Sequence, residues 1–307
     1  MMNKSILCDL IVVGGGPAGL TATMYAIRKK LNVLMVSKDL GGKTSYRLAL
    51  PWVKDYHVIR GLDVVNSFKS ELEYLNFARH MEAVDRVEKR EDHFVVRTRG
   101  GAELKTKAVL IASGAKQKLL DVPGEKKFIM RGLCYSAVSY APLFIDRTTV
   151  VVGDCKLALR AAAELAVVAK MVHLVGVCGG MLETDLGRFL NGRENVEIYN
   201  DYKVVEVLGE DFAEQIVVES PAGKKVKIES DSIFVELGLT PNAQMVAGLV
   251  DMDEQDRIVV DGLNCTSMPG IFAAGDVTNT YGEQVLIAVG EGAKAALSAY
   301  EYLLPSL

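Results

Sequence analysis

The chain has 307 residues, of which 50% are hydrophobic, and its formal net charge at pH 7 is −4. A chain of this length is typical of two domains, and this hydrophobic content is enough for two cores. Basic and acidic residues are spread along the whole sequence. This even distribution argues against a protein that binds nucleic acid.

No apolar run reaches the length of a membrane-spanning helix, because the nearest candidate, residues 161–177, is interrupted by Glu164 and Lys170. The N-terminus does not resemble a signal peptide, since Asp9 interrupts its short apolar stretch. The cysteines are Cys8, Cys134, Cys155, Cys178 and Cys265. They are scattered and form no CxxC pair, and the four histidines are dispersed. We therefore expect a cytoplasmic protein with reduced thiols, no membrane association and no metal site.

A glycine-rich turn follows the first predicted strand. Residues 8–13 are a short apolar run, as expected for a buried parallel strand, and residues 17–30 have helical periodicity. Gly14 permits a tight turn, Gly16 lets the backbone approach a pyrophosphate, and Gly19 lets the helix pack closely on the strand. The phosphates would lie at the helix N-terminus, where free N–H groups and the helix dipole favour an anion. The segment therefore predicts a dinucleotide-binding site.

The end of the predicted second strand, residues 32–36, departs from the usual pattern. An acidic residue normally stands there and accepts the ribose hydroxyls. This chain has Ser37 and Lys38 instead. Because a serine hydroxyl can still bond a ribose, we expect a weaker contact at this position, not a lost site.

The predicted elements divide between a split domain and an insert. The first domain, residues 1–116 and 244–307, is expected to contain a helix at 62–75, a β-rich stretch at 78–98, a strand with its turn at 108–114, the segment Ile-Phe-Ala-Ala-Gly-Asp-Val at 271–277 and a helix at 284–302. The insert, residues 117–243, is expected to contain strands at 149–153, 171–177, 196–207, 214–219 and 232–237 and a helix at 156–170. The segment at 271–277 is the partner that the glycine turn needs when the dinucleotide is FAD. The order predicts an α/β protein with two nucleotide-binding, Rossmann-like domains of three layers (ββα), the FAD domain being split around the second.

Six segments resemble the low-molecular-weight thioredoxin reductases of the pyridine nucleotide-disulfide oxidoreductase superfamily. They are residues 14–19, 41–43, 111–115, 121–124, 238–242 and 273–277, and the resemblance covers essentially the whole chain. It implies an FAD cofactor and a homodimer formed through the flavin domains. It also implies that Asp276 binds the ribityl or phosphate region, that Gln284 and Val285 lie beside the isoalloxazine, and that Gly42 and Lys43 lie near its other edge. The full set of expected FAD-binding residues is Gly14, Gly16, Pro17, Ala18, Gly19, Ser37, Lys38, Gly42, Lys43, Val84, Ala112, Ser113, Gly114, Gly275, Asp276, Gln284 and Val285.

The redox dithiol of that family is absent from the corresponding loop. Both cysteine positions are serine, Ser136 and Ser139, and Tyr140 replaces the acid that serves as the proton donor in the family. A hydroxyl titrates far above physiological pH and forms no disulfide, so a relay by thiol exchange is chemically excluded there. Cys134 lies two residues early and would need a remote partner. The sequence therefore leaves the catalytic residues unknown.

The second nucleotide site is altered as well. Residues 153–158 read Gly-Asp-Cys-Lys-Leu-Ala where a pyridine-nucleotide turn would read GxGxxA or GxGxxG. Cys155 places a side chain where the backbone should touch a pyrophosphate, and Asp154 adds negative charge. Residues 176–178 (Gly-Val-Cys) stand where relatives that use NADPH have a His-Arg-Arg cluster for the 2′-phosphate. A phosphate needs charge-assisted donors, so we expect that NADPH is not the native reductant. NADH is less firmly excluded, because the helix N-terminus remains.

One hypothesis is an FAD-dependent oxidoreductase that receives electrons from a protein such as ferredoxin and passes them to an unknown acceptor. The chain is similar here to ferredoxin-dependent flavin thioredoxin reductases, which also lack the NADPH motifs and share the Ala-Pro-Leu stretch at 141–143, but which retain their dithiol. An acidic ferredoxin would need a basic docking face. The candidates are Lys116, Lys118, Lys126, Lys127 and Arg131.

Two further hypotheses stay open. In one, the vacated second site binds another ligand, such as a second flavin or an adenine nucleotide, and Tyr135 or Tyr140 stacks on its ring. In the other, the protein is not an enzyme but a flavin-bearing redox sensor or binding module. The flavin motifs of the sequence are consistent with all three hypotheses.

Overall fold

The structure is a computed structural model that describes residues 7–45, 48–53, 61–75, 78–135 and 140–307. The chain divides into two compact units: residues 1–45, 59–116 and 240–307 form the first, and residues 46–58 and 117–239 form the second. Two of the passages between the units lie within β7 (Ala115–Gln117) and β16 (Leu239–Pro241), which pair with each other.

The first unit is built on a seven-stranded sheet with the order β3-β2-β1-β6-β5-β4, in which β17 also pairs with β6. The strands are β1 (Cys8–Val13), β2 (Val33–Val36), β3 (Arg79–His80), β4 (Val84–Lys89), β5 (Phe94–Thr98), β6 (Glu103–Ile111) and β17 (Ile271–Ala273). The pairings around β1, β2, β3 and β17 are parallel, whereas β4 and β5 continue the sheet in antiparallel fashion. The helical segments of this unit are α1 (Pro17–Arg28), η1 (Gly42–Ser45), α2 (Gly61–Tyr74), η4 (Gln244–Val246), α8 (Val285–Leu303) and η5 (Leu304–Ser306).

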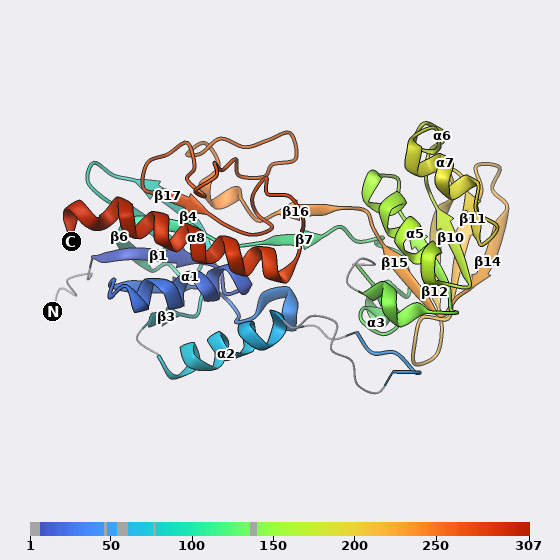
Figure 1. The fold of residues 1–307 in the computed structure, drawn as a ribbon, viewed down its shortest axis with the longest axis horizontal. Coiled ribbons are helices and arrows are strands. Elements are labelled where there is room, and N and C mark those ends of the chain that lie inside the picture. Colours follow the sequence, from blue (N-terminus) through green and yellow to red (C-terminus); the bar gives the residue numbers. More distant parts are fainter. Residues whose placement is uncertain (1–6, 46–47, 54–60, 76–77, 136–139) are drawn as a thin grey trace. The chain divides into compact units, whose positions relative to one another are not determined.

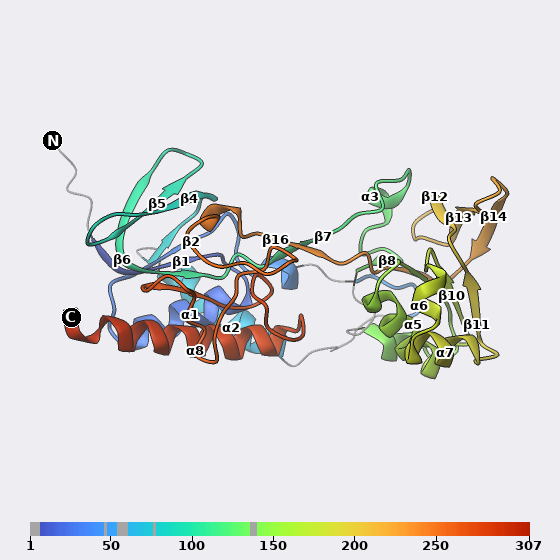
Figure 2. The same ribbon diagram turned by 90° about the horizontal axis from the view of Figure 1, so that it is seen from above.

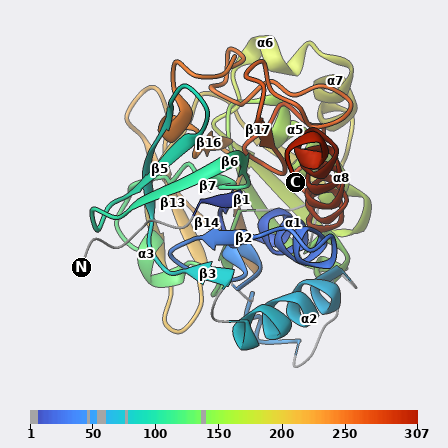
Figure 3. The ribbon, with the colours of Figure 1, turned by 90° about the vertical axis from the view of Figure 1, so that its left-hand side faces the viewer.

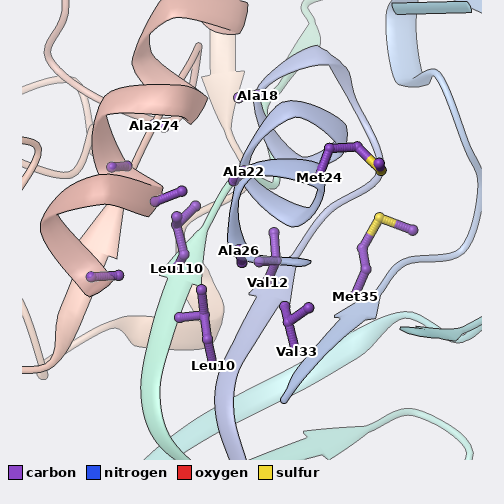
Figure 4. Close-up of a cluster of buried hydrophobic side chains, with 14 of the residues drawn as sticks. Leu10, Val12, Ala18, Ala22, Met24, Ala26, Val33, Met35, Leu110 and Ala274 are labelled. Atoms are coloured by element: carbon purple, nitrogen blue, oxygen red, sulfur yellow. The ribbon is translucent and has the colours of Figure 1, made fainter. Parts of the chain in front are cut away.

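Both faces of the parallel part of this sheet are covered, as its near-continuous apolar strands predict. Leu10, Val12 and Leu110 point into a core beneath α1 and α8 (Figure 4). Ile11 and Val13, the alternate residues of β1, belong to a second core on the opposite face, toward β4 and β5. The view along the first unit shows α1 and α8 together on one side of β1 and β2 (Figure 3).

Helices α1 and α8 lie in close contact near their N-terminal ends (Figure 1). Gly292 makes this approach feasible, because a Cβ there would lie only 2.2 Å from the carbonyl oxygen of Ala18. Small residues continue the contact along both helices, with Ala22 and Ala295 fully buried. The contact fixes α8 against the turn that precedes α1.

The second unit is also layered. Its five-stranded parallel sheet has the order β11-β10-β9-β15-β8, and a three-stranded antiparallel sheet has the order β12-β13-β14. The strands are β8 (Leu133–Cys134), β9 (Thr148–Val152), β10 (Met171–Val175), β11 (Val196–Tyr199), β12 (Lys203–Leu208), β13 (Gln215–Glu219), β14 (Lys225–Glu229) and β15 (Ser232–Val235). The helical segments are α3 (Glu125–Phe128), η3 (Ala141–Phe144), α5 (Lys156–Val168), α6 (Gly179–Leu182) and α7 (Asp185–Asn191). One core lies between the parallel sheet and α5, and the other lies between the two sheets (Figure 2).

Two observed features differ from the sequence-based expectations. The single strand expected at 196–207 is two strands, β11 and β12, separated by a turn in which Asp201 has a φ of 57°. Residues 48–53 group with the second unit: Ala49 pairs with Arg131, and the Trp52 indole donates a hydrogen bond to the carbonyl of Leu143 at 3.1 Å. The predicted α/β class with Rossmann-like parallel sheets is confirmed.

The contact between α1 and α8 yields a test of stability. Replacing Gly292 with alanine forces a methyl group toward the Ala18 carbonyl, and we expect a loss of about 1–3 kcal/mol in the free energy of unfolding. The matched control is Gly290→Ala in the same helix, where a Cβ would meet no atom within 4 Å. That change should be neutral, or stabilising by up to about 1 kcal/mol, because alanine is the better helix former. Equal melting temperatures for the two variants would show that the contact is not constrained as described.

Candidate functional site

The turn between β1 and α1 contains glycines of two kinds. A Cβ at Gly14 would lie 2.2 Å from the Ala112 carbonyl oxygen, and one at Gly19 would lie 1.9 Å from the Gly14 carbonyl oxygen. Both positions therefore need glycine for the packing of the protein itself. Gly16 is different: its φ is −75°, and a Cβ there would meet no protein atom within 4 Å. Neither strain nor packing explains that glycine, whereas close approach of a ligand phosphate does.

The N-terminus of α1 is open to an anion. Gly16 is the N-cap residue and makes no side-chain cap, and Pro17 occupies the first turn. The N-cap residue therefore supplies no side-chain acceptor to the first N–H groups of this 12-residue helix. Together with the helix dipole, they form a site for a phosphate.

Two other segments meet the start of α1. The Gly41 N–H donates to the Gly15 carbonyl at 2.7 Å, and a Cβ on Gly42 would lie 3.2 Å from the Gly16 Cα. From the C-terminal part of the chain, a Cβ on Gly275 would lie 3.2 Å from the Ala18 Cβ. The structure thus brings residues of three distant predicted motifs to one place in the first unit.

An ion pair joins two of these segments. Lys43 Nζ lies 2.5 Å from Asp276 Oδ2, and the Asp276 side chain is only 14% exposed. Glu283 lies close by: it lines a small cavity with Asp276 and Arg257. Burial raises the pKa of the Glu283 carboxyl, the negative charge of Asp276 raises it further, and Lys43 and Arg257 oppose these effects. Glu283 therefore holds its proton more strongly than an exposed glutamate does.

The turn after β6 is held by reciprocal hydrogen bonds with Asn242. The Ser113 hydroxyl donates to the Asn242 carbonyl at 2.7 Å, and the Asn242 amide nitrogen Nδ2 donates to the Ser113 carbonyl at 2.9 Å. The Asn242 N–H donates to the Gly114 carbonyl at 2.9 Å. Ala112, also among the expected FAD-binding residues, is buried beside Gly14. These bonds fix the turn in front of β1, so Asn242 is a supporting residue that the expected set omits.

The expected residues outside this group have varied surroundings. Ser37 is buried and donates its hydroxyl to the Asp39 carbonyl at 2.7 Å, so toward a ribose it can act only as an acceptor. Lys38 is 74% exposed and lies 3.6 Å from the Asp39 carboxylate. Val84 is a core residue at the start of β4. Gln284, followed by Val285, is the N-cap residue of α8 and makes no side-chain cap.

Glu291 is a site residue that the sequence reasoning missed. It is 8% exposed on α8, one carboxylate oxygen accepts the Gly275 N–H at 3.0 Å, and the other accepts the Thr280 hydroxyl at 2.7 Å. The only signal in the sequence is an acidic residue among small residues on an otherwise apolar helix face. The carboxylate holds the turn that carries Asp276.

The corresponding turn of the second unit is built differently. A Cβ at Gly153 would lie 2.5 Å from the Glu236 carbonyl oxygen and 2.7 Å from the Ala158 Cβ, so the close packing of strand and helix is retained. Cys155 takes the position equivalent to Gly16 as the N-cap residue of α5, and its thiol donates to the Glu236 carbonyl at 3.3 Å. The space that Gly16 leaves open is therefore occupied here by a side chain.

Residues 176–178, which follow β10, include no basic side chain. Gly176 has a φ of 88°, Val177 is fully buried, and Cys178 is exposed as the N-cap residue of α6. Arg188, the next basic residue along the chain, pairs with Asp185 at 2.5 Å.

The segment where the family dithiol would lie is described in part. Ser136 and Ser139 lie outside the described residues. Tyr140 is partly buried against the core that contains Phe144. Tyr135 donates its hydroxyl to Glu125 Oε1 at 3.1 Å, and burial, followed by the Glu125 charge, raises the Tyr135 pKa.

Two features are absent from the residues that the structure describes. No group of three or more His, Cys, Asp or Glu side chains in these ranges could hold a metal ion. Within the same part of the chain, no helix has both the length and the apolar character needed to cross a bilayer.

Comparison with known proteins agrees with this geometry. The family model of the pyridine nucleotide-disulphide oxidoreductases matches residues 8–292. The thioredoxin reductase from Streptococcus pyogenes MGAS5005 has a similar structure, with a TM-score of 0.85 and 30% identity, over 98% of this chain and 100% of that one. The match therefore covers nearly all of both chains.

Two curated relatives are longer than this chain. The F subunit of the alkyl hydroperoxide reductase of Staphylococcus aureus (strain Mu50) is 33% identical over 308 residues, which cover 96% of this chain and 59% of the relative. NADH dehydrogenase of Bacillus subtilis (strain 168) is 31% identical over 299 residues, which cover 96% of this chain and 58% of the relative. The chain thus spans somewhat less than three fifths of their length. The family match supports FAD as the cofactor of this chain.

The role assigned to Glu291 can be tested directly. Glu291→Ala leaves the Gly275 N–H and the Thr280 hydroxyl without their acceptor, which costs about 1–3 kcal/mol. We expect less FAD per purified chain and a lower melting temperature, with partial recovery in Glu291→Gln, which keeps one acceptor oxygen. Glu301→Ala, on the exposed face of the same helix, is the control. FAD content in Glu291→Ala equal to that of the parent would contradict the assigned role.

Proposed function

Because the chain belongs to the pyridine nucleotide-disulphide oxidoreductase family, we propose that it is an FAD-dependent oxidoreductase reduced by a protein donor. In this proposal NADPH is not the reductant, and electrons leave the flavin without a dithiol relay. The bound FAD supplies the capacity to accept and release electrons. The residues of the chain bind it, hold its phosphates and set the charge around it.

The observation that carries the proposal is the contrast between Gly16 and Cys155. The two residues are the N-caps of α1 and α5, the helices that follow β1 and β9. At Gly16 the position of a Cβ is open, whereas Cys155 has a side chain there whose thiol is bonded to the Glu236 carbonyl. One turn supports close approach of a pyrophosphate, and the other opposes it.

The charges around the second turn also oppose NADPH binding. Asp154 is exposed beside the second turn, and residues 176–178 include no cation. A 2′-phosphate bound there would lose hydration without gaining a charge-assisted donor, which makes tight NADPH binding unfavourable.

The residues at the dithiol positions cannot carry electrons away from the flavin. Serine at positions 136 and 139 cannot form a disulfide, and Tyr140 is a far weaker acid than a carboxylic acid. We therefore propose that the acceptor meets the flavin itself, or a group carried by another protein. Its identity is not specified by these residues.

A ferredoxin-like donor would need basic residues on the surface. Lys118 and Lys126 are exposed in the second unit, whereas Lys127 donates to the Gly209 carbonyl at 3.3 Å and Arg131 lies 4.0 Å from Asp211. Lys116 belongs to the first unit. We propose Lys118 and Lys126 as the first residues to test for donor docking. A homodimer formed through the FAD-binding units is a further proposal from the family resemblance.

NADH is the competing donor. The names of the two curated relatives include an NADH dehydrogenase, and the N-terminus of α5 still lacks a side-chain cap. An adenine nucleotide or a second flavin at this turn would use the same feature. Stacking on Tyr135 is disfavoured, because its hydroxyl is bonded to the buried Glu125. A redox sensor without catalytic turnover is the remaining alternative.

Anaerobic titration of the flavin separates these donors. We expect reduced ferredoxin to bleach the flavin absorbance, and NADPH at micromolar concentration to leave it oxidised, because the second turn provides neither an open backbone nor a cation. Thioredoxin disulfide should not be reduced under any of these conditions. Rapid bleaching by NADPH would refute the proposal. Bleaching by NADH alone would favour the competing donor.

Cys155→Gly tests whether this side chain is what closes the second turn. Removing it restores a GxGxxA turn, and we expect faster reduction by NADH, while NADPH stays poor because residues 176–178 are unchanged. Cys178→Ser is the matched control, since it removes an exposed thiol and leaves the turn as it is. Stopped-flow measurement of flavin reduction gives both rates. If Cys155→Gly reduces no faster than the control, the side chain is not the obstacle.

A further inference from the structure

The ion pair between Lys43 and Asp276 bridges two segments that are far apart in sequence. Lys43 follows the glycine pair that lies against Gly15 and Gly16, and Asp276 follows Gly275, which lies against Ala18. The pair therefore stands at the start of α1, where the FAD phosphates are held. Lys43 Nζ and Asp276 Oδ2 are 2.5 Å apart.

The charges around this pair do not cancel. Asp276, Glu283 and Glu291 are acidic, and Lys43 and Arg257 are basic, so this group of five side chains has one more acid than base. Glu291 is committed to the Gly275 N–H and the Thr280 hydroxyl. Arg257 lies 2.7 Å from Asp253, which takes up part of its charge. Lys43 is therefore the base that directly faces Asp276.

The excess of acidic side chains matters because the cofactor is itself an anion. The pyrophosphate of FAD brings further negative charge to the start of α1, and reduction of the flavin increases its negative charge. Asp276 is largely shielded from water, with 14% of its side chain exposed, so solvent screens its charge poorly. Without Lys43, an ionised Asp276 would repel the cofactor that it helps to bind.

We propose that Lys43 is a positioning residue of the FAD site, which acts on the cofactor through Asp276 and controls both FAD affinity and the flavin reduction potential. The ion pair holds the Asp276 carboxylate in one orientation and neutralises it. Both members of the pair also act on Glu283, because Asp276 raises the pKa of its carboxyl and Lys43 lowers it. This inference rests on FAD as the cofactor and is independent of the electron donor.

The test compares Lys43→Gln with Lys43→Arg in the purified holoprotein. Lys43→Gln should bind FAD about tenfold more weakly, as expected for loss of one charged hydrogen bond. Its midpoint potential, measured with dithionite and a reference dye, should become more negative, because the Asp276 charge is then no longer neutralised and disfavours the more negative, reduced cofactor. Lys43→Arg should restore both values. Lys294→Gln, on the exposed face of α8, removes the same charge elsewhere and should change neither.

A double-mutant cycle shows whether Lys43 acts through Asp276. If it does, Lys43→Gln should have little further effect on FAD affinity in an Asp276→Asn background. Losses that multiply in the double variant would overturn the proposal, as would FAD affinity and midpoint potential in Lys43→Gln equal to those of the parent. Neither readout uses ferredoxin or a pyridine nucleotide, so failure here leaves the proposed donor untouched.

Discussion

The proposed FAD site depends on one steric constraint: the backbone around the start of α1 is packed so closely that a Cβ is excluded at several of its glycines. Gly14 and Gly19 meet neighbouring carbonyl oxygens, and Gly292 brings α8 against Ala18. This packing places the turns that carry Lys43 and Asp276 beside the same helix N-terminus. Within that tight frame, Gly16 alone among these residues has open space where a Cβ would be. The site is thus an open position at Gly16, and the backbone around it is closely packed.

The two units share a type of fold but differ at the turn between strand and helix. Both have a parallel sheet with a helix that begins shortly after a strand, and both have a closely packed glycine at the first position of the turn, Gly14 in one and Gly153 in the other. They differ at the N-cap, where Gly16 leaves room for a phosphate and Cys155 fills that room. Gly14 and Gly153 are required by the packing of the protein itself, whereas Gly16 is not. The second unit therefore has a parallel sheet and a following helix like those of the first, but a side chain stands at its N-cap position.

Much of this could be predicted from the sequence because local patterns decide it. The apolar runs of β1 and β9 and the glycines beside them specify strand, turn and helix without reference to distant residues. The position of Glu291 could not be inferred in the same way, since its role depends on the Gly275 and Thr280 groups that folding brings to α8. The Lys43–Asp276 pair likewise joins residues more than 230 positions apart. The attachment of residues 48–53 to the second unit depends on the contacts of Trp52, which no periodicity indicates.

We predict that the first turn binds its nucleotide and that the second does not, and equilibrium binding measures both on the same sample. Calorimetric titration of the FAD-loaded protein with NADP⁺, alongside determination of flavin per chain, is the most direct test. We expect one FAD per chain and no NADP⁺ binding at micromolar concentrations. One FAD per chain together with stoichiometric, micromolar NADP⁺ binding would contradict the account.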